Sequence, residues 1–268
     1  MMKQLFKHGY QAIILTLLLV SCKKEKIAEP EVAETVISGR SASEISNVFK
    51  GPNVAIGGGH ARSWVRINHL NVPLELGIEL TESAFENLPH DRAALVLLLH
   101  HKALEVTPFK HIYFTYNSHG HPPVGVFSVP HFDAHFFLTS NEERLAIPQV
   151  TPATLPFFNH VPPAGYMAPT YFPTAPEPQM GLHWSPPPPT FMPFSKVMVY
   201  GSYKGKLTFI EPMITVAHME SGGSSNNYLQ PAKFAVAGNY PTKFNIYKDA
   251  QSGNYNITLS NFVARAAN

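Results

Sequence analysis

The sequence contains the stretch Val129-Pro130-His131-Phe132-Asp133-Ala134-His135-Phe136-Phe137, in which hydrogen-bonding side chains alternate with aromatic or small ones. Successive side chains of a β-strand point to opposite faces of the sheet, so this period of two predicts a strand. His131, Asp133 and His135 would share one face of it. The opposite face would be apolar and belong to the core, with Phe132, Ala134 and Phe136. The stretch therefore predicts a β fold with a candidate site on one of its strands.

The spacing of this strand limits what it can bind alone. With a rise of roughly 3.3 Å per residue, same-face neighbours lie about 6.6 Å apart, and His131 and His135 about 13 Å apart. A flat strand does not bring both histidines to one ion, whose bonds to nitrogen are about 2.0–2.1 Å long. Either the strand is bulged, or two of the residues are ligands while the third, such as Asp133, holds an imidazole. Further ligands must come from other segments.

Three residues elsewhere are candidates for the remaining ligands. His183 lies in Met180-Gly181-Leu182-His183-Trp184, and Glu211 lies at the end of an apolar strand, where a charge needs a partner. His121 lies in the turn just before the central strand. Histidines with a carboxylate and a free position make a catalytic zinc site, and they also suit iron or manganese. We therefore predict a divalent metal, with zinc favoured, held by His121, His131, His135 and His183, with Glu211 and Asp133 as catalytic carboxylates.

Two functions fit this pattern. The first is a metal-dependent hydrolase, in which the ion lowers the pKa of a bound water and a free carboxylate acts as base. The second is a non-catalytic protein whose histidine face binds a metal or a partner, or supports contacts in a homo-oligomer. A solvated polar face would give the same alternation. The surroundings of Glu211 distinguish the two functions. A position against the histidine face beside an open pocket would favour the hydrolase, and pairing with a lysine would favour the non-catalytic binding protein.

The N-terminus has the features of a bacterial lipoprotein. A positively charged start precedes an apolar run over residues 12–20, which is too short to span a bilayer, and the run ends at Cys22. We expect a signal peptide over residues 1–21, then a lipidated Cys22 and a flexible tether over residues 22–50. Lys24 is not the aspartate that retains lipoproteins in an inner membrane, so the expected location is the outer membrane of a bacterial envelope. No other cysteine is present for disulfides or nucleophilic catalysis.

The remaining chain, residues 51–268, is expected to form a single β-rich domain. The 25 prolines disfavour long helices, and a formal net charge of +2 without a basic stripe gives no reason to expect nucleic acid as a partner. We expect an antiparallel sandwich or barrel-like domain with one or two short helices and a long, ordered loop rich in proline and aromatic residues over 148–193.

Local patterns add detail to this outline. Thr81 begins a short helix that Pro89 ends, and a helical turn is expected near residues 43–49. Residues 214–218 are expected to form a strand. A loop rich in glycine, serine and asparagine is expected over residues 221–227.

Several short motifs resemble those of an uncharacterised bacterial envelope family, whose best-known member is a sigma-E-controlled Thermus protein that carries a hydrolase label. The motifs are Gly120-His121-Pro122-Pro123, His131-Phe132-Asp133-Ala134-His135-Phe136, Met180-Gly181-Leu182-His183-Trp184, Tyr200-Gly201-Ser202-Tyr203 and Glu211-Pro212-Met213. The resemblance covers about residues 52–220 and implies a β-rich envelope domain that can assemble into oligomers. The chain departs from the family after Trp184, where Ser185 and four prolines replace an acidic residue.

Overall fold

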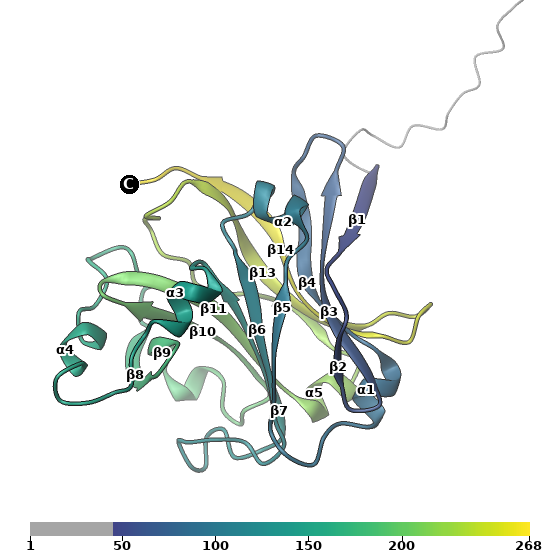
Figure 1. Ribbon diagram of the computed structural model, residues 1–268, viewed down its shortest axis with the longest axis horizontal. Helices are drawn as coiled ribbons and strands as arrows, with labels where there is room; N and C mark the ends of the chain where they lie inside the picture. The colour runs from purple at the N-terminus through teal and green to yellow at the C-terminus, as the bar shows by residue number, and fades with distance from the viewer. Residues whose placement is uncertain (1–44) are drawn as a thin grey trace, which may run out of the picture. The chain divides into compact units, whose positions relative to one another are not determined.

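The computed structural model describes residues 45–268, which form two antiparallel sheets of seven strands each (Figure 1). Each sheet has open edges and neither closes on itself, so the predicted mainly β, sandwich-like fold is confirmed. The predicted signal peptide and most of the predicted tether lie outside the described residues. Within the described part, no helix has the length and apolar character needed to cross a membrane.

The first sheet combines strands from both ends of the described chain, and the second is built from its middle. In spatial order the first sheet contains β1 (Ser46–Lys50), β3 (Gly59–Asn68), β4 (Pro73–Leu80), β14 (Tyr255–Arg265), β13 (Gly238–Lys248) and β12 (Ser224–Asn227), with β2 (Val54–Ile56) paired to β3. The second sheet contains β5 (Ala93–Leu98), β6 (His111–Asn117), β7 (His131–Phe137), β11 (Lys206–Thr215), β10 (Lys196–Tyr203), β9 (Gly181–Ser185) and β8 (Phe172–Glu177).

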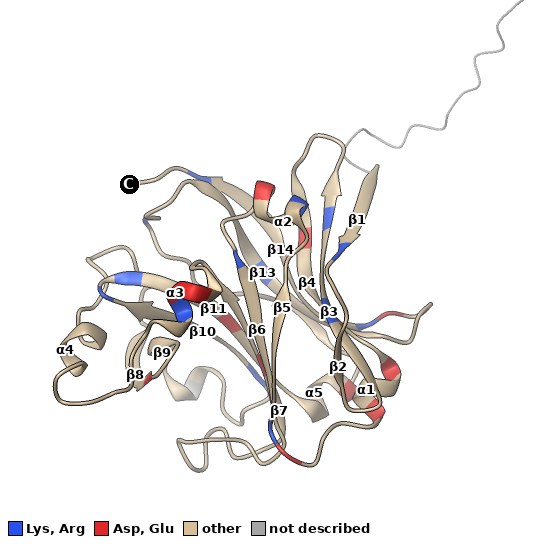
Figure 2. Ribbon diagram, in the orientation of Figure 1, with Lys and Arg blue, Asp and Glu red and all other residues tan. Residues whose placement is uncertain are grey.

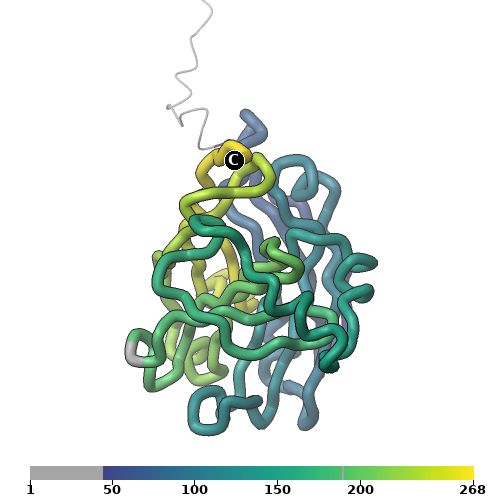
Figure 3. Tube along the Cα trace, turned by 90° about the vertical axis from the view of Figure 1, so that its left-hand side faces the viewer, coloured from purple at the N-terminus to yellow at the C-terminus, as the bar shows by residue number. Residues whose placement is uncertain are grey.

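The helices are short and connect strands. They are α1 (Glu82–Glu86), α2 (His101–Val106), α3 (Asn141–Leu145), α4 (Leu155–Phe158), α5 (Val216–Glu220) and the 3-10 helix η1 (Pro188–Thr190). Thr81 caps α1 as predicted, because its side chain accepts a hydrogen bond from the Ala84 amide. The described residues contain more helices than the one or two expected. Figure 3 shows the side of the domain that carries α4, β8 and β9.

Strand β7 contributes to the core that fills the space between the sheets. Phe132, Ala134 and Phe136 are fully buried, as the alternation predicted. The Phe132 ring stacks on Phe114 of β6 at 5.3 Å and lies 6.2 Å from Phe85 of α1. Burying each such ring stabilises the fold by about 1.5–3 kcal/mol, which fixes the register of β7 against its neighbours.

The other face of the second sheet is also covered, although antiparallel sheets often leave one face in water. A second apolar cluster lies on it, formed by Phe127, Val197, Val199 and Met213, with Phe191 and Phe194 packed against them. Phe127 comes from the connection between β6 and β7, and the other two rings come from the proline-rich segment before β10. These segments bury the polar side of β7.

Two expectations about local structure are wrong in detail. Residues 46–49 do not form a helical turn: they belong to β1, which pairs with β3 from Ser46 opposite Asn68 to Lys50 opposite Trp64. The predicted loop over 148–193 is ordered, but it contains helix α4 and the hairpin β8–β9. Strand β8 tolerates its prolines because it is the edge strand of its sheet, where missing amide donors cost least.

Two further boundaries differ near residue 220. The strand expected over 214–218 ends at Thr215, whose hydroxyl accepts a hydrogen bond from the His218 amide at 3.1 Å and caps α5. The segment expected to be a loop over 221–227 contains β12, which pairs with β13. The polar sequence of β12 does not predict a strand, because pairing with β13 supplies the stability that intrinsic strand propensity does not.

Charged residues are scattered over both sheets in the view of Figure 2.

Candidate metal centre

All six residues singled out in the sequence lie on the covered outer face of the second sheet. His131, Asp133 and His135 project from β7, where Asn117, Thr115 and Tyr113 of β6 lie opposite them. On the other side of β7, Ile210 pairs with Phe136 and Met213 with Asp133, and this register places Glu211 opposite His135. His183 is brought in by β9, and His121 by the connection that precedes β7.

These residues form two groups rather than one. His121, His131 and Asp133 form the first triad, and His135, His183 and Glu211 form the second; within each, one ligand atom from every residue lies within 4.8 Å of the others. The division follows from strand geometry, because His131 and His135 are separated by two same-face steps. Either triad could hold a metal ion.

In the first triad, Asp133 is held from one side and open on the other. Its Oδ2 accepts hydrogen bonds from Asn117 Nδ2 at 2.6 Å and from Thr115 Oγ1 at 3.1 Å. His131 Nε2 lies 3.2 Å from Oδ1, and His121 Nε2 lies 3.5 Å from Oδ2. Oδ1 is nevertheless buried without a hydrogen-bond partner. The carboxylate therefore turns one unsatisfied oxygen toward His131.

In the second triad, the carboxylate has no hydrogen-bond donor of its own. His135 Nε2 lies 3.2 Å from Glu211 Oε1, and His183 Nε2 lies 3.9 Å from Oε2. Oε2 is buried without a hydrogen-bond partner. The exposed fraction of the Glu211 side chain is only 3%, and no lysine or arginine pairs with it among residues 45–268. A buried carboxylate in this state needs a proton or a cation.

The orientation of the rings is set by backbone carbonyls. His131 Nδ1 lies 2.6 Å from the Val129 oxygen, His135 Nδ1 lies 3.1 Å from the Tyr113 oxygen, and His183 Nδ1 lies 3.2 Å from the Ala175 oxygen. A carbonyl can only accept, so each Nδ1 carries the hydrogen, and in a neutral ring Nε2 then keeps a free lone pair. Metal-binding histidines in proteins are oriented in this way by their second nitrogen.

Burial and neighbouring groups shift the pKa values of the histidines and carboxylates in the two triads. It lowers the pKa of His135 to about 3 and that of His183 to about 4, so both rings are neutral at pH 7. Burial, together with the charge of Asp133, raises the pKa of Glu211 well above its ordinary value. Burial alone would also raise the pKa of Asp133, but the adjacent imidazoles of His121 and His131 together outweigh burial and lower that pKa. The two carboxylates are therefore shifted in opposite directions.

His121 behaves differently from the other histidines. Burial would lower its pKa, but the hydrogen bond and the charge of Asp133 outweigh burial and raise it. Its Nδ1 donates to the Pro122 oxygen at 2.7 Å, and its side chain is 35% exposed. In the first triad a proton on His121 can pair with Asp133, so a metal ion there competes with that proton.

Gly201 leaves room for the Phe209 ring, which packs against the two histidines of the second triad. Gly201 of β10 lies opposite both Phe209 of β11 and His183 of β9. A Cβ atom at Gly201 would lie 2.1 Å from the Phe209 ring, so only glycine leaves the ring its place. That ring lies 4.8 Å from His135 and 5.2 Å from His183 and limits the positions that both imidazoles can take.

Sequence reasoning missed the residues that hold Asp133. Asn117 and Thr115 donate to its Oδ2, and neither residue was singled out in the sequence. A signal was present, since the alternation of residues 110–116 places Thr115 on the polar face with His111 and Tyr113. The pairing that aligns β6 with β7 was not available from that pattern.

No protein-family model, curated protein or solved structure matches the chain. The resemblance to the bacterial envelope family therefore stays a prediction, and the site has to be interpreted from its own geometry.

Proposed function

We propose that this protein is an envelope lipoprotein that binds divalent transition-metal ions, with zinc favoured, at its two histidine–carboxylate triads. The observation that carries the proposal is the second triad. There, two neutral imidazoles turn unprotonated Nε2 atoms toward the buried carboxylate of Glu211. Acceptors that face each other in a buried site need a proton or a cation between them: without metal Glu211 favours a proton, and a metal ion would take the place of that proton.

The donor set favours zinc over calcium or magnesium. Two imidazole nitrogens and one carboxylate oxygen are typical zinc ligands, whereas calcium and magnesium prefer oxygen alone. Iron and manganese are compatible with the same donors. The first triad offers the same ligands. A metal ion has to displace a proton in either triad, the one favoured on His121 in the first and the one favoured on Glu211 in the second.

Burial argues against the alternative in which the histidine face makes contacts between subunits. Within one chain His131 is 0% exposed, Asp133 is 5% exposed and His135 is 2% exposed. A surface that packs against a second copy would be open in the single chain, so we assign these side chains to binding inside the domain.

Hydrolysis is a second candidate function, favoured by the opposite pKa shifts of the two carboxylates. A pair of carboxyl groups whose environments push their pKa values apart is typical of acid–base sites. Glu211, with its raised pKa, suits a proton acceptor for water on an ion in the first triad, because in the second triad it is itself a ligand. The lowered pKa of Asp133 makes it a weak base. A zinc ion with three protein ligands keeps one position for water and lowers the pKa of that water to about 7.

Elemental analysis of the full-length protein tests metal binding. After purification with zinc, iron and manganese available, we expect a stoichiometric metal content that falls by one ion per chain in His135→Ala and by one in His131→Ala. His69→Ala removes an exposed histidine and should change nothing. Wild-type protein without stoichiometric metal, or two variants that both keep the full content, would contradict the proposal.

Hydrolysis is tested separately on the metal-loaded protein. We expect turnover of a chromogenic ester such as p-nitrophenyl acetate that a chelator stops and that Glu211→Gln abolishes. If His135→Ala and wild type turn over the ester at the same rate, the protein binds metal without using it in this reaction.

A further inference from the structure

A cleft distinct from the two triads lies where the two sheets meet near β10 and β12. Its volume is about 310 Å³, within the usual range for small-molecule sites. Lys196, Val197 and Met198 of β10 line it from the second sheet, and Asn226 and Asn227 of β12 line it from the first. None of the six triad residues lines this cleft.

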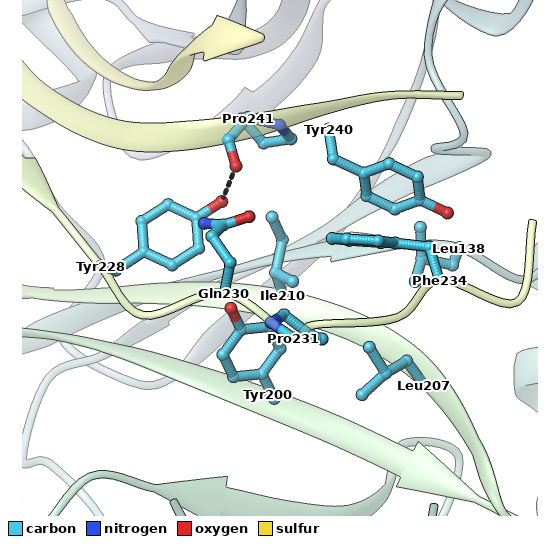
Figure 4. Close-up of a pocket in the computed structure, with 10 residues that line it drawn as sticks. All are labelled: Leu138, Tyr200, Leu207, Ile210, Tyr228, Gln230, Pro231, Phe234, Tyr240 and Pro241. Atoms are coloured by element: carbon cyan, nitrogen blue, oxygen red, sulfur yellow. Dashed lines mark hydrogen bonds between the residues drawn. The ribbon is translucent and has the colours of Figure 1, made fainter. Parts of the chain in front are cut away.

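Tyr171 and Tyr228 also line the cleft, and hydrogen bonds to the backbone fix the position of both side chains. Tyr171 Oη donates to the Met198 oxygen at 2.9 Å, and Tyr228 Oη donates to the Pro241 oxygen at 2.6 Å. Figure 4 shows the second bond from a smaller pocket that Tyr228 also lines. Because both hydroxyls are already bonded to the backbone, each tyrosine offers a ligand its ring rather than its hydroxyl. Fixed aromatic rings bind flat ligands at a low cost in side-chain entropy.

The cleft also contains a cation without an acidic partner. Lys196 is half-buried, and no carboxylate lies within 4.0 Å of its ammonium group among residues 45–268. Its charge reaches His218, where burial and Lys196 together lower the pKa. A half-buried cation of this kind favours an anionic ligand.

We propose that the cleft binds a small organic anion in which a planar ring carries one carboxylate. The ring would lie against Tyr171 and Tyr228, and the carboxylate would accept a hydrogen bond from Lys196 Nζ. One lysine balances one negative charge, so a dianionic phosphate would leave a charge unpaired at a half-buried site. The proposal is independent of metal binding at the triads.

Titration of the full-length protein with benzoate and its neutral analogue benzamide tests this class of ligand. The protein is first freed of metal with a chelator, so that carboxylate binding to an ion does not contribute. We expect saturable benzoate binding with a Kd of about 1 mM or tighter, and benzamide binding weaker by about tenfold or more. Lys196→Gln should weaken benzoate by about tenfold and leave benzamide unchanged.

A matched control and a second variant keep the result interpretable. Lys206→Gln makes the same replacement at an exposed lysine and should leave both affinities unchanged. Tyr171→Leu should weaken both probes, because it removes the ring face but not the charge. A thermal melt checks that each variant is folded. The proposal is overturned by a lack of saturable benzoate binding, by equal affinity for the two probes, or by benzoate binding that Lys196→Gln does not change.

Discussion

Replacing Glu211 by glutamine should change stability in opposite directions with and without metal. In metal-free protein the folded state favours a protonated Glu211, because burial and the charge of Asp133 raise its pKa well above 4.5. A glutamine keeps the shape, needs no proton, and can donate its amide hydrogen to His135 Nε2, which lies 3.2 Å from the present Oε1. With zinc present, the same replacement removes one of the three ligands of the second triad.

The size of the effect follows from the pH. A carboxyl whose folded pKa is raised costs the fold about 1.4 kcal/mol for each pH unit between its unfolded pKa and its folded pKa. Starting from 4.5, the cost at pH 7 reaches at most about 3.5 kcal/mol. A domain of this size gains about 2–4 °C in Tm per kcal/mol, so metal-free Glu211→Gln should melt up to about 14 °C above wild type. Zinc at 100 times its Kd should stabilise wild type by about 2.7 kcal/mol per site.

Thermal unfolding of the full-length protein, followed by circular dichroism over a range of pH with chelator or with zinc, checks both signs. Metal-free wild type should lose stability as the pH rises above 4.5 toward the folded pKa of Glu211, and the variant should lack this slope. Glu86→Gln, at an exposed position on α1, serves as the matched control. The reasoning is refuted if the variant melts below wild type in chelator at neutral pH, or if zinc raises the Tm of both proteins equally.

Two further replacements test the packing of Gly201 beside the second triad and the ion pairs of Glu79 in the first sheet. Gly201→Ala puts a Cβ 2.1 Å from the Phe209 ring and should cost about 1–3 kcal/mol in denaturant unfolding while weakening zinc binding; Gly238→Ala, whose nearest contact would be 3.6 Å, should change neither. Glu79→Gln should flatten the acid limb of stability. Burial would raise the pKa of Glu79, but the hydrogen bonds and charges of Arg62 and Lys50 together outweigh burial and lower that pKa. Wild type therefore keeps this contribution above pH 4.5 and loses it as the pH falls through the lowered pKa. An acid limb identical in the two proteins would contradict the Glu79 prediction.

The polar and apolar faces of β7 could be assigned from the sequence because side-chain direction in a strand depends only on the period of two. The same rule indicated that His131 and His135 would not meet on one ion, and the structure places them in separate triads. The cap at Thr81 was also predictable, since capping is a local interaction between a side chain and the next turn of backbone.

Contacts between distant segments were beyond the reach of these local rules. The proline-rich segment was expected to be a loop, but its hairpin β8–β9 carries His183 to the second triad. The strand β12 has a polar sequence without strand propensity and exists because β13 pairs with it. The burial of the histidine face could not be predicted either, because Phe127 and Phe194 cover it from segments on either side of β7 in the chain.

The sequence by itself determined the β class, the polar face of β7 and the residue types of the candidate site. These depend on local periodicity and on the chemistry of each side chain. Only the tertiary structure decided that Glu211 faces His135 and that the six residues divide into two triads. Strand register, sheet order and burial fix those facts, and all three result from packing between segments that lie far apart in the chain.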